Sequence, residues 1–448
     1  MRRSGQGRPS TAALLPIYVL SCIDQEGQAV ELSYSPHDST LIDETGKSLL
    51  TDIDAADFTV ATPVSPSMPG WKSDAPLTLK IQLGLNCNYS CSYCNQASEV
   101  GSGTVTKTAD ADEFLQELGS WLKAAPERIE FWGGEPFLYM AKLKRLVPDL
   151  RARFPLAKFS IVTNGSLLDE DILAFIEKFD IFIAVSHDGP GQHLRGPDPF
   201  DDPERATWLQ ALWKRRGGDR GRVSFNAVLT PANADIRATR QWLANQLGDA
   251  MLTLDTEGVV SVYDDQALAG PGHWSKDDYA LLHQSIVEGF LDGQALQFGD
   301  IAYKARDFIH SLQTKRPSSS LGQKCGMDDP HQLAVDLKGN VMTCQNTGAQ
   351  GKHNLGHVSA INQVKLNTST HWSHRESCNH CPVLQLCKGS CMYLHDDLFT
   401  QSCENEYHYN TAILAGVLKS VTGLTLQSIS GDIRRPPKIK RVIKVIAV

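Results

Sequence analysis

The feature that most constrains this 448-residue chain is a group of three closely spaced cysteines. Cys87, Cys91 and Cys94 follow a C-x3-C-x2-C pattern inside LGLNCNYSCSYCNQ. This spacing lets a tight loop place three thiolates on three irons of a cubane and leaves the fourth iron open to another molecule. Zinc sites also use short cysteine spacings, but the residues after Cys94 offer no fourth ligand. A disulfide framework is disfavoured because a chain of this length buries a large core without covalent links.

Composition indicates a globular enzyme of two or three domains. Hydrophobic residues make up 41% of the chain and charged residues 21%. The formal net charge of −8 argues against a nucleic-acid partner, and no apolar run is long enough to cross a membrane. The first residues resemble a secretion signal, but Pro16 interrupts a short apolar stretch. We therefore expect a cytoplasmic protein.

Strand-like and helix-like segments alternate over residues 77–263. Helical patterns occupy 111–125, 169–179 and 236–248. This alternation predicts a parallel sheet of right-handed βαβ units, and six units suit an α/β fold of the partial (β/α)6 barrel type. The cysteine loop would follow the first strand, at the sheet edge where ligands bind. The six strand candidates are 77–84, 128–134, 158–165, 181–189, 222–230 and 251–263.

The flanking segments differ from this pattern. Residues 1–76 contain short β-like runs and end in a Pro- and Ser-rich stretch, 62–76, that reads as a linker. A structural cap and a peptide-recognition module are both open for this part. We divide the chain into an N-terminal module with its linker (1–76), the barrel (77–300), and a cysteine-rich domain with a basic tail (301–448).

Seven of the remaining eight cysteines lie between residues 325 and 403. DLKGN, which precedes the second of them, predicts a hairpin turn with Gly339 at a positive φ. A pair of zinc knuckles is the alternative for this region, because the C-x2-C unit alone fits zinc as well as iron. The seven, in order, are Cys325, Cys344, Cys378, Cys381, Cys387, Cys391 and Cys403.

The first cysteine group, with Tyr93 before its last member, resembles the radical S-adenosylmethionine (SAM) enzymes. The second resembles the SPASM domain of radical SAM enzymes that modify peptides. The resemblance implies three [4Fe–4S] clusters, one binding SAM and two auxiliary. The sets it implies for the auxiliary clusters are Cys378, Cys381, Cys387 and Cys403 for one, and Cys325, Cys344 and Cys391 for the other. The cluster held by Cys325, Cys344 and Cys391 would have its fourth ligand position either open or filled by another residue, and His331 is a possible ligand there.

The resemblance also implies a set of SAM-binding residues. FWGGEP contains Gly133, Gly134, Glu135 and Pro136, which match the motif that binds the methionyl amino group; a bare glycine pair would be only a turn. The other residues implied are Tyr93 against adenine, Ser186 at the ribose, Arg195 at the carboxylate, Thr163, Asn164 and Asp188 at strand ends, and Asn226, Val228 and Leu229 around the adenine.

The implied chemistry is reductive cleavage of SAM to a 5′-deoxyadenosyl radical that abstracts hydrogen from a substrate. The expected substrate is a ribosomally made precursor peptide that receives an oxidative carbon–carbon or thioether crosslink, with a flavodoxin- or ferredoxin-type electron donor. Formylglycine formation on a sulfatase and peptide epimerisation are alternatives. Gln345 stands where sulfatase-maturing relatives place a basic Asp, and only Cys22 is left as a thiol donor, in a position typical of a buried structural cysteine. A non-catalytic electron-transfer protein fits less well, and no catalytic side chain is predicted.

Overall fold

The computed structural model describes residues 17–54, 57–261 and 263–431. The basic tail at 434–448 lies outside the described residues. No helix in the described part of the chain is both long and apolar enough to cross a membrane.

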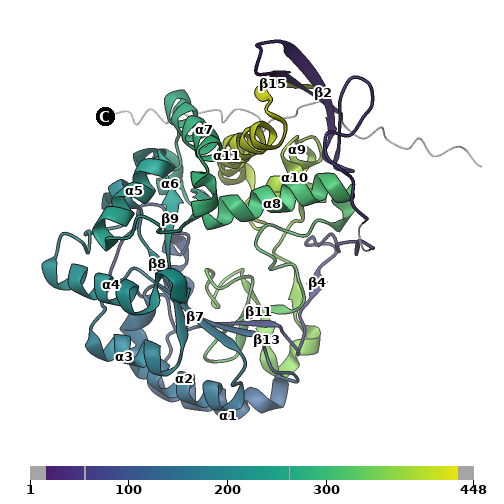
Figure 1. The fold of residues 1–448 in the computed structure, drawn as a ribbon. Helices are drawn as coiled ribbons and strands as arrows, with labels where there is room; N and C mark the ends of the chain where they lie inside the picture. Colours follow the sequence, from purple (N-terminus) through teal and green to yellow (C-terminus); the bar gives the residue numbers. More distant parts are fainter. Residues whose placement is uncertain (1–16, 55–56, 262, 432–448) are drawn as a thin grey trace, which may run out of the picture.

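Six parallel strands form the centre of the molecule (Figure 1). All six strand candidates and the predicted α/β class are confirmed, with each strand a little shorter than its sequence pattern. The strands pair in chain order, as expected for successive right-handed βαβ units. They are β5 (Thr78–Gln82), β6 (Arg128–Trp132), β7 (Lys158–Thr163), β8 (Ile181–Ser186), β9 (Val223–Leu229) and β10 (Leu254–Val259).

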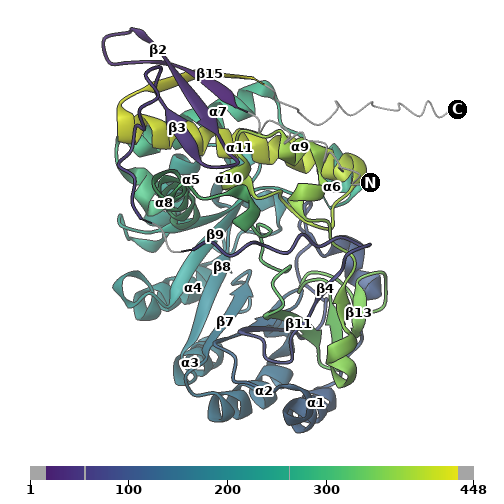
Figure 2. The same cartoon turned by 90° about the vertical axis from the view of Figure 1, so that its right-hand side faces the viewer.

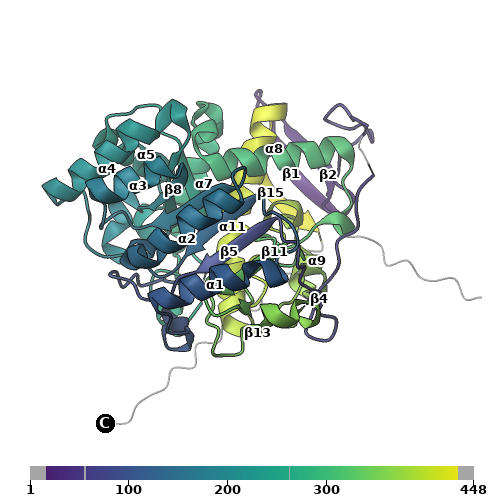
Figure 3. The ribbon, with the colours of Figure 1, turned by 90° about the horizontal axis from the view of Figure 1, so that it is seen from below.

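Helices between these strands cover one face of the sheet, with α1 and α2 in front of β5 when the molecule is seen from below (Figure 3). Aspartates 169, 202 and 235 cap three of the helices by accepting backbone N–H bonds in the first turn. Sequence alone located α1, α3 and α5. The helices are α1 (Thr108–Trp121), α2 (Met140–Arg153), α3 (Glu170–Lys178), α4 (Pro203–Arg216) and α5 (Ile236–Leu247).

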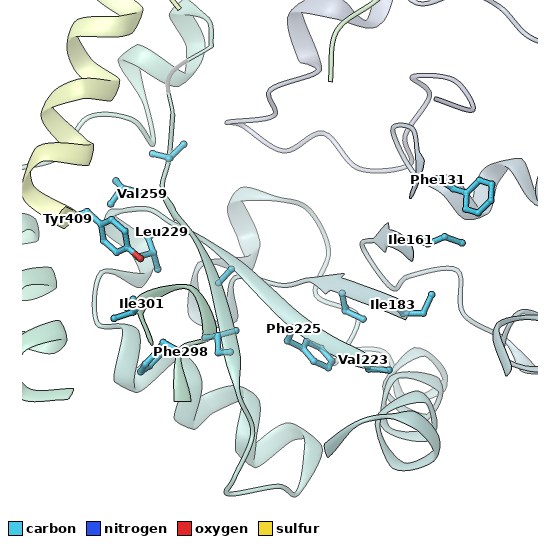
Figure 4. Packing of buried hydrophobic residues seen from close by; sticks show 14 of the residues in the cluster. Phe131, Ile161, Ile183, Val223, Phe225, Leu229, Val259, Phe298, Ile301 and Tyr409 are labelled. Atoms are coloured by element: carbon cyan, nitrogen blue, oxygen red, sulfur yellow. The ribbon is translucent and has the colours of Figure 1, made fainter. Parts of the chain in front are cut away.

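The core lies between these helices and the sheet, and continues toward the C-terminal helices (Figure 4). On β9, Val223, Phe225 and Ala227 are buried, whereas the alternating residues Ser224 and Asn226 are only partly buried. A strand turns successive side chains to opposite faces, so one face joins the core and the other is left for polar groups. Tyr409 brings the last long helix into the same cluster.

The cysteine-rich region continues the barrel sheet. β11 (Gln332–Asp336) pairs in parallel with β5, and β12 (Asn340–Met342) and β13 (Asn354–His357) add antiparallel strands to make nine. The hairpin predicted from DLKGN joins β11 to β12, with Gly339 at φ 78°. β5 therefore pairs with β6 of the barrel on one side and with β11 of the cysteine-rich region on the other.

The remaining helices lie at the opposite end of the sheet from α1 and α2 in Figures 1 and 2. Residues 301–320, at the start of the predicted cysteine-rich domain, are mostly α8. The longest helix, α11, packs along α7 and carries the last cysteine of the chain. These helices are α6 (Asp265–Ala269), α7 (Lys276–Leu291), α8 (Gly299–Thr314), α9 (Glu376–Asn379), α10 (Leu384–Cys387) and α11 (Asp396–Thr422).

The N-terminal module is a small antiparallel sheet completed by the other end of the chain. β1 (Tyr18–Ile23), β2 (Ala29–Ser35) and β3 (Thr40–Ile42) form three of its strands. β15 (Thr425–Gly431), which follows α11, pairs with β1 (Figure 2). Cys22 is 2% exposed within this sheet, which confirms the buried position expected for it.

Residues 57–76, here called the strap, run over the cysteine-rich region. Within the strap, β4 (Gly70–Trp71) pairs with β14 (Lys365–Leu366). Backbone bonds also join Ala61 to Ser319 and Ser73 to Pro330. The sequence reads this stretch as a linker because of its prolines and serines. The structure instead shows ordered backbone whose hydrogen bonds go to a region about 250 residues away.

Candidate active site

The loop with Cys87, Cys91 and Cys94 leaves the carboxyl end of β5, as predicted. Cys87 is exposed and the other two thiols are half-buried. Backbone N–H groups of Tyr89 and Gln96 donate to the sulfurs of Cys87 and Cys94, both at 3.4 Å. Donors aimed at sulfur stabilise a thiolate and fix its direction, so this loop suits metal ligation.

The two glycines of FWGGEP are required by the close approach of this loop. The Gly134 N–H donates to the Gly84 carbonyl at 3.1 Å, and the Glu135 N–H donates to the Asn86 carbonyl at 3.0 Å. A Cβ on Gly134 would overlap the backbone of Asn86, and one on Gly133 would lie 2.8 Å from the Gly84 oxygen. Only glycine permits this contact between the end of β6 and the start of the cysteine loop.

Glu135 joins the ends of β6 and β7. It is 1% exposed, and its carboxylate accepts bonds from the Phe137 N–H, the Thr163 hydroxyl and the Asn164 N–H at 2.8–3.0 Å. Burial raises the pKa of Glu135 while these donors oppose the rise. Asn164 extends the connection to Asn88 in the cysteine loop at 2.9 Å. Glu135 and Thr163 thus hold the strand ends against the loop.

Tyr93, Asp188 and Arg195 meet beside the loop. The Tyr93 hydroxyl donates to the Asp188 carboxylate, and an Arg195 terminal nitrogen lies 3.1 Å from that hydroxyl and 3.6 Å from Asp188. Burial is the largest influence on the pKa of Cys91, which it raises to about 11, and Arg195 opposes that rise. The Arg195 Nε is buried and has no hydrogen-bond partner among the described residues. The cluster therefore holds a fixed cation with a free N–H, which suits a carboxylate ligand.

The ends of β8 and β9 carry the other predicted residues. Ser186 is 8% exposed and pairs in register with Asn226, whose side chain accepts a bond from Ser224 at 3.0 Å. Leu229 is fully buried in the hydrophobic core on the opposite face of β9 from Asn226. The alternation of the strand therefore separates Leu229 from Asn226, and the adenine-pocket role of Leu229 stays a prediction.

His187 is a buried residue beside this site that sequence reasoning missed. Its ring lies 3.0 Å from Asp198, accepts the Gly189 N–H and stacks on Trp242 with centroids 5.1 Å apart. These contacts hold the segment that carries Asp188 and Arg195. The only sequence signal was its position next to Asp188 at the end of a strand.

Four cysteines of the C-terminal region line one pocket, here called the four-cysteine pocket. Phe399 and Tyr407 form part of its wall. Burial raises the pKa of Cys378 to about 12, so the metal-free thiol is protonated at neutral pH and ligation would displace its proton. The set consists of Cys378, Cys381, Cys387 and Cys403, the four that the family resemblance groups together.

A turn of unusual backbone separates this pocket from the next cysteine. Lys388, Gly389 and Ser390 all have positive φ, at 53°, 85° and 57°. Two of the three carry side chains and are therefore held in a disfavoured conformation by their surroundings. The turn directs Cys387 into the four-cysteine pocket and Cys391 away from it.

Cys325, Cys344 and Cys391 form the second set, here called the three-cysteine site. Burial raises the pKa of Cys344 to about 12, with the neighbouring Cys391 adding to the rise. The Cys325 side chain is exposed to solvent, and the surrounding protein still raises the pKa of its thiol by desolvation. The Tyr263 hydroxyl hydrogen-bonds Cys391.

His331, the possible fourth ligand, lies on the exposed side of this region. Its ring nitrogen is 3.1 Å from the Ala75 carbonyl in the strap. Tyr263 instead lies near all three thiols, and each of them contributes to raising the pKa of its hydroxyl group, which burial raises most. Sequence reasoning missed Tyr263 because it lies far from every cysteine along the chain.

Hydrogen bonds join the two cysteine systems. Gln82, at the end of β5, donates to the carbonyls of Gln345 and Thr347 at 2.8 and 3.0 Å. Gln96 donates to Asn346 at 3.3 Å, and Glu99 accepts the Gly348 N–H at 2.9 Å. The segment after Cys344 is thus held by residues that flank the first cysteine loop. Within the described residues, no three His, Cys, Asp or Glu side chains converge closely enough to hold a single metal ion.

Comparison with known proteins finds similarity that centres on the barrel. Residues 81–243 match the model of the radical SAM superfamily. The radical SAM cyclopropyl synthase TigE of Paramaledivibacter caminithermalis is 22% identical over 70% of this chain and 67% of its own length. The cysteine-type anaerobic sulfatase-maturating enzyme of Clostridium perfringens is 23% identical over 74% of this chain and 93% of its own length.

The fold is also shared with a solved structure. Native anSMEcpe with bound AdoMet and Cp18Cys peptide aligns with a TM-score of 0.56 and 19% identity, over 78% of this chain and 99% of that one. The likeness therefore extends beyond the barrel into the cysteine-rich region.

Proposed function

Because residues 81–243 form a radical SAM domain, we propose that the chain is a peptide maturase that cleaves SAM reductively and crosslinks a ribosomally made precursor peptide. The observation that carries this proposal is the position of the loop with Cys87, Cys91 and Cys94 at the end of β5, beside Arg195 and the glycine pair. The fold shared with a peptide-bound structure, and the two relatives above, support a peptide substrate.

In this proposal Cys87, Cys91 and Cys94 hold a [4Fe–4S] cluster, which supplies the electron that cleaves SAM. Arg195 binds the SAM carboxylate through its free Nε, and Ser186 and Asn226 contact the nucleoside from the partly exposed face of β8 and β9. Gly133, Gly134 and Pro136 shape the methionine site. Tyr93 and Asp188 hold the guanidinium, and Glu135, Thr163 and Asn164 keep the loop in place. The described residues thus bind and orient SAM and exclude water.

Two auxiliary clusters complete the proposal. The four-cysteine pocket offers four thiols to one of them, and its apolar wall suits a buried cluster. The three-cysteine site would hold the other, next to the Tyr263 hydroxyl. An auxiliary cluster near the substrate can accept an electron, which makes net oxidation of a peptide feasible.

Two residues favour crosslinking over formylglycine formation and over epimerisation. Gln345 has no titratable group and its buried side-chain oxygen has no hydrogen-bond partner among the described residues, so it offers no base for formylglycine formation. The relative named as a sulfatase-maturating enzyme keeps that reaction as the second candidate. Epimerisation needs a thiol donor, and Cys22 is buried in the N-terminal sheet. The relative named as a cyclopropyl synthase supports carbon–carbon bond formation. A cytoplasmic location and a flavodoxin- or ferredoxin-type donor complete the proposal.

The test uses short peptides encoded beside the gene, incubated anaerobically with reconstituted protein, SAM and reductant. Crosslinking removes two hydrogen atoms from the peptide and prevents fragmentation between the linked residues in tandem mass spectrometry. An aldehyde that reacts with a hydrazide probe would indicate formylglycine instead. Unchanged mass with altered chirality would indicate epimerisation. SAM cleavage without any change in these peptides would remove the support for a peptide substrate.

A further inference from the structure

Lys72 is a buried lysine that the strap contributes to the cysteine-rich region. It is 4% exposed, and its ammonium donates to the carbonyls of Met327, Gln332 and Asp329 at 2.5, 2.9 and 3.3 Å. Met327 and Asp329 lie in the turn that follows Cys325, and Gln332 is the first residue of β11 after this turn. A lysine is seldom this buried unless its charge is used, because ordering and desolvating the side chain are unfavourable.

The turn depends on this lysine for much of its hydrogen bonding. Its own backbone supplies bonds from Gly326 to Gln323, from Asp329 to Gly326 and from Gln332 to Asp329. The strap adds a bond from Ser73 to Pro330, immediately beyond Lys72. The Lys72 ammonium, with its three donors, therefore links the two ends of the turn and restrains the backbone next to Cys325.

Lys72 also places positive charge beside two of the three thiols. Burial lowers the pKa of Lys72 to about 8, and the negative groups that oppose this fall are, in order, Asp328, Cys325, Asp329 and Cys344. Lys80 on β5 also acts on Cys325 and Cys344, but it is paired with Glu130 at 3.1 Å. Among the described residues, no carboxylate lies within ion-pair distance of the Lys72 ammonium. Lys72 thus forms no ion pair within the described residues, whereas Lys80 is paired with Glu130.

We propose that Lys72 is a positioning residue of the three-cysteine site, where it anchors the Cys325 turn and supplies a fixed positive charge next to the bound cluster. This inference rests on the proposed auxiliary cluster there. A nearby cation stabilises the more negative, reduced form of a cluster, so Lys72 raises the reduction potential of this site relative to an uncharged residue. The strap is accordingly part of a cofactor site.

The experiment compares Lys72→Met, which removes the charge and all three donors at similar length, with Lys72→Arg, which retains the charge. Lys365→Met is the matched control, since Lys365 is an exposed residue of the neighbouring strand β14 that stacks on Trp71. Three quantities are measured in the full chain: iron per protein after reconstitution, midpoint potentials by EPR-monitored titration, and amide exchange of residues 325–332 in the metal-free protein.

Lys72→Met is expected to speed exchange in the turn, and either to lose about a third of the iron or to keep it with one cluster at a lower midpoint potential. Lys72→Arg should retain the potential better than Lys72→Met, and Lys365→Met should match the wild type. Lys72→Met with wild-type exchange, iron content and potentials would overturn the inference. A Cys325→Ser/Cys344→Ser protein that loses no iron would instead refute the auxiliary cluster at this site, and the exchange data would still report whether Lys72 anchors the turn.

Discussion

The two cysteine sites of the C-terminal region are built in different ways. The four-cysteine pocket comes from one stretch, 378–403. Arg375, three residues before it, donates at 2.8–3.1 Å to four carbonyls of this stretch, which are those of Cys391 and of three residues near it. The three-cysteine site draws its thiols from three segments and its buried cation, Lys72, from the strap. Both use a buried cation to hold ligand-bearing backbone. Only the first can be assembled by a continuous piece of chain.

This difference has a physical consequence. A local site forms as soon as its own segment folds, whereas a composite site needs the strap, β5 and the hairpin to be in place. The ligands of the pocket should therefore contribute mainly to the stability of the C-terminal region. The composite site should be sensitive to changes far away in the sequence.

The largest effect is expected from the pocket. Replacing Cys378 and Cys387 with Ala removes two ligands and leaves an unfilled hollow between α10 and α11, so the loaded protein should lose more than about 4 kcal/mol of unfolding free energy. Denaturant titration of the anaerobic protein, with limited proteolysis to locate the damage, measures this. Unfolding at the wild-type denaturant concentration would show that the pocket holds no structural cluster.

A smaller effect is expected from the three-cysteine site. Replacing Cys344 with Ala should remove iron from this site but lower the unfolding free energy by only about 1–2 kcal/mol, because β5, β11 and the strap still support its walls. The same denaturant titration gives the comparison. A loss as large as that of the pocket variant would erase the distinction between local and composite sites.

The smallest effect is expected from the bonds between the two cysteine systems. Gln82→Ala removes two bonds, to the carbonyls of Gln345 and Thr347, and should cost about 1 kcal/mol. It should loosen the segment after Cys344 and leave the pocket unchanged. Amide exchange of residues 345–348 and 378–391 tests this, and equal changes in both segments would contradict it.

Local patterns in the sequence were enough to predict much of this molecule. Six strands follow from runs of apolar residues, and the four cysteines of the pocket were grouped by the resemblance of their order to the SPASM domain. The prediction for Leu229 followed its position at the end of a strand, whereas the alternation of side chains along β9 places it on the opposite face from Asn226. The Pro- and Ser-rich composition of the strap concealed its order.

Lys72, Gln82 and Tyr263 carried no signal because each acts through a contact with a distant segment. A lysine in a polar stretch looks like any exposed lysine until the turn that it anchors is placed beside it. Gln82 fits the alternation of side chains along β5, but the carbonyl groups that accept its hydrogen bonds lie more than 250 residues away in the sequence. Long-range contacts of single residues are thus the part of the site that sequence patterns do not encode.

The central claim is that the Cys87 loop supports radical cleavage of SAM. The decisive measurement is 5′-deoxyadenosine formation by the anaerobically reconstituted protein with SAM and dithionite, beside a protein in which Cys87, Cys91 and Cys94 are replaced by Ala. We predict 5′-deoxyadenosine and methionine from the wild type and none from the triple variant, with the same fold by circular dichroism because the loop contributes little to the core. Intact SAM with the fully loaded wild type, or equal cleavage by the triple variant, would contradict the account.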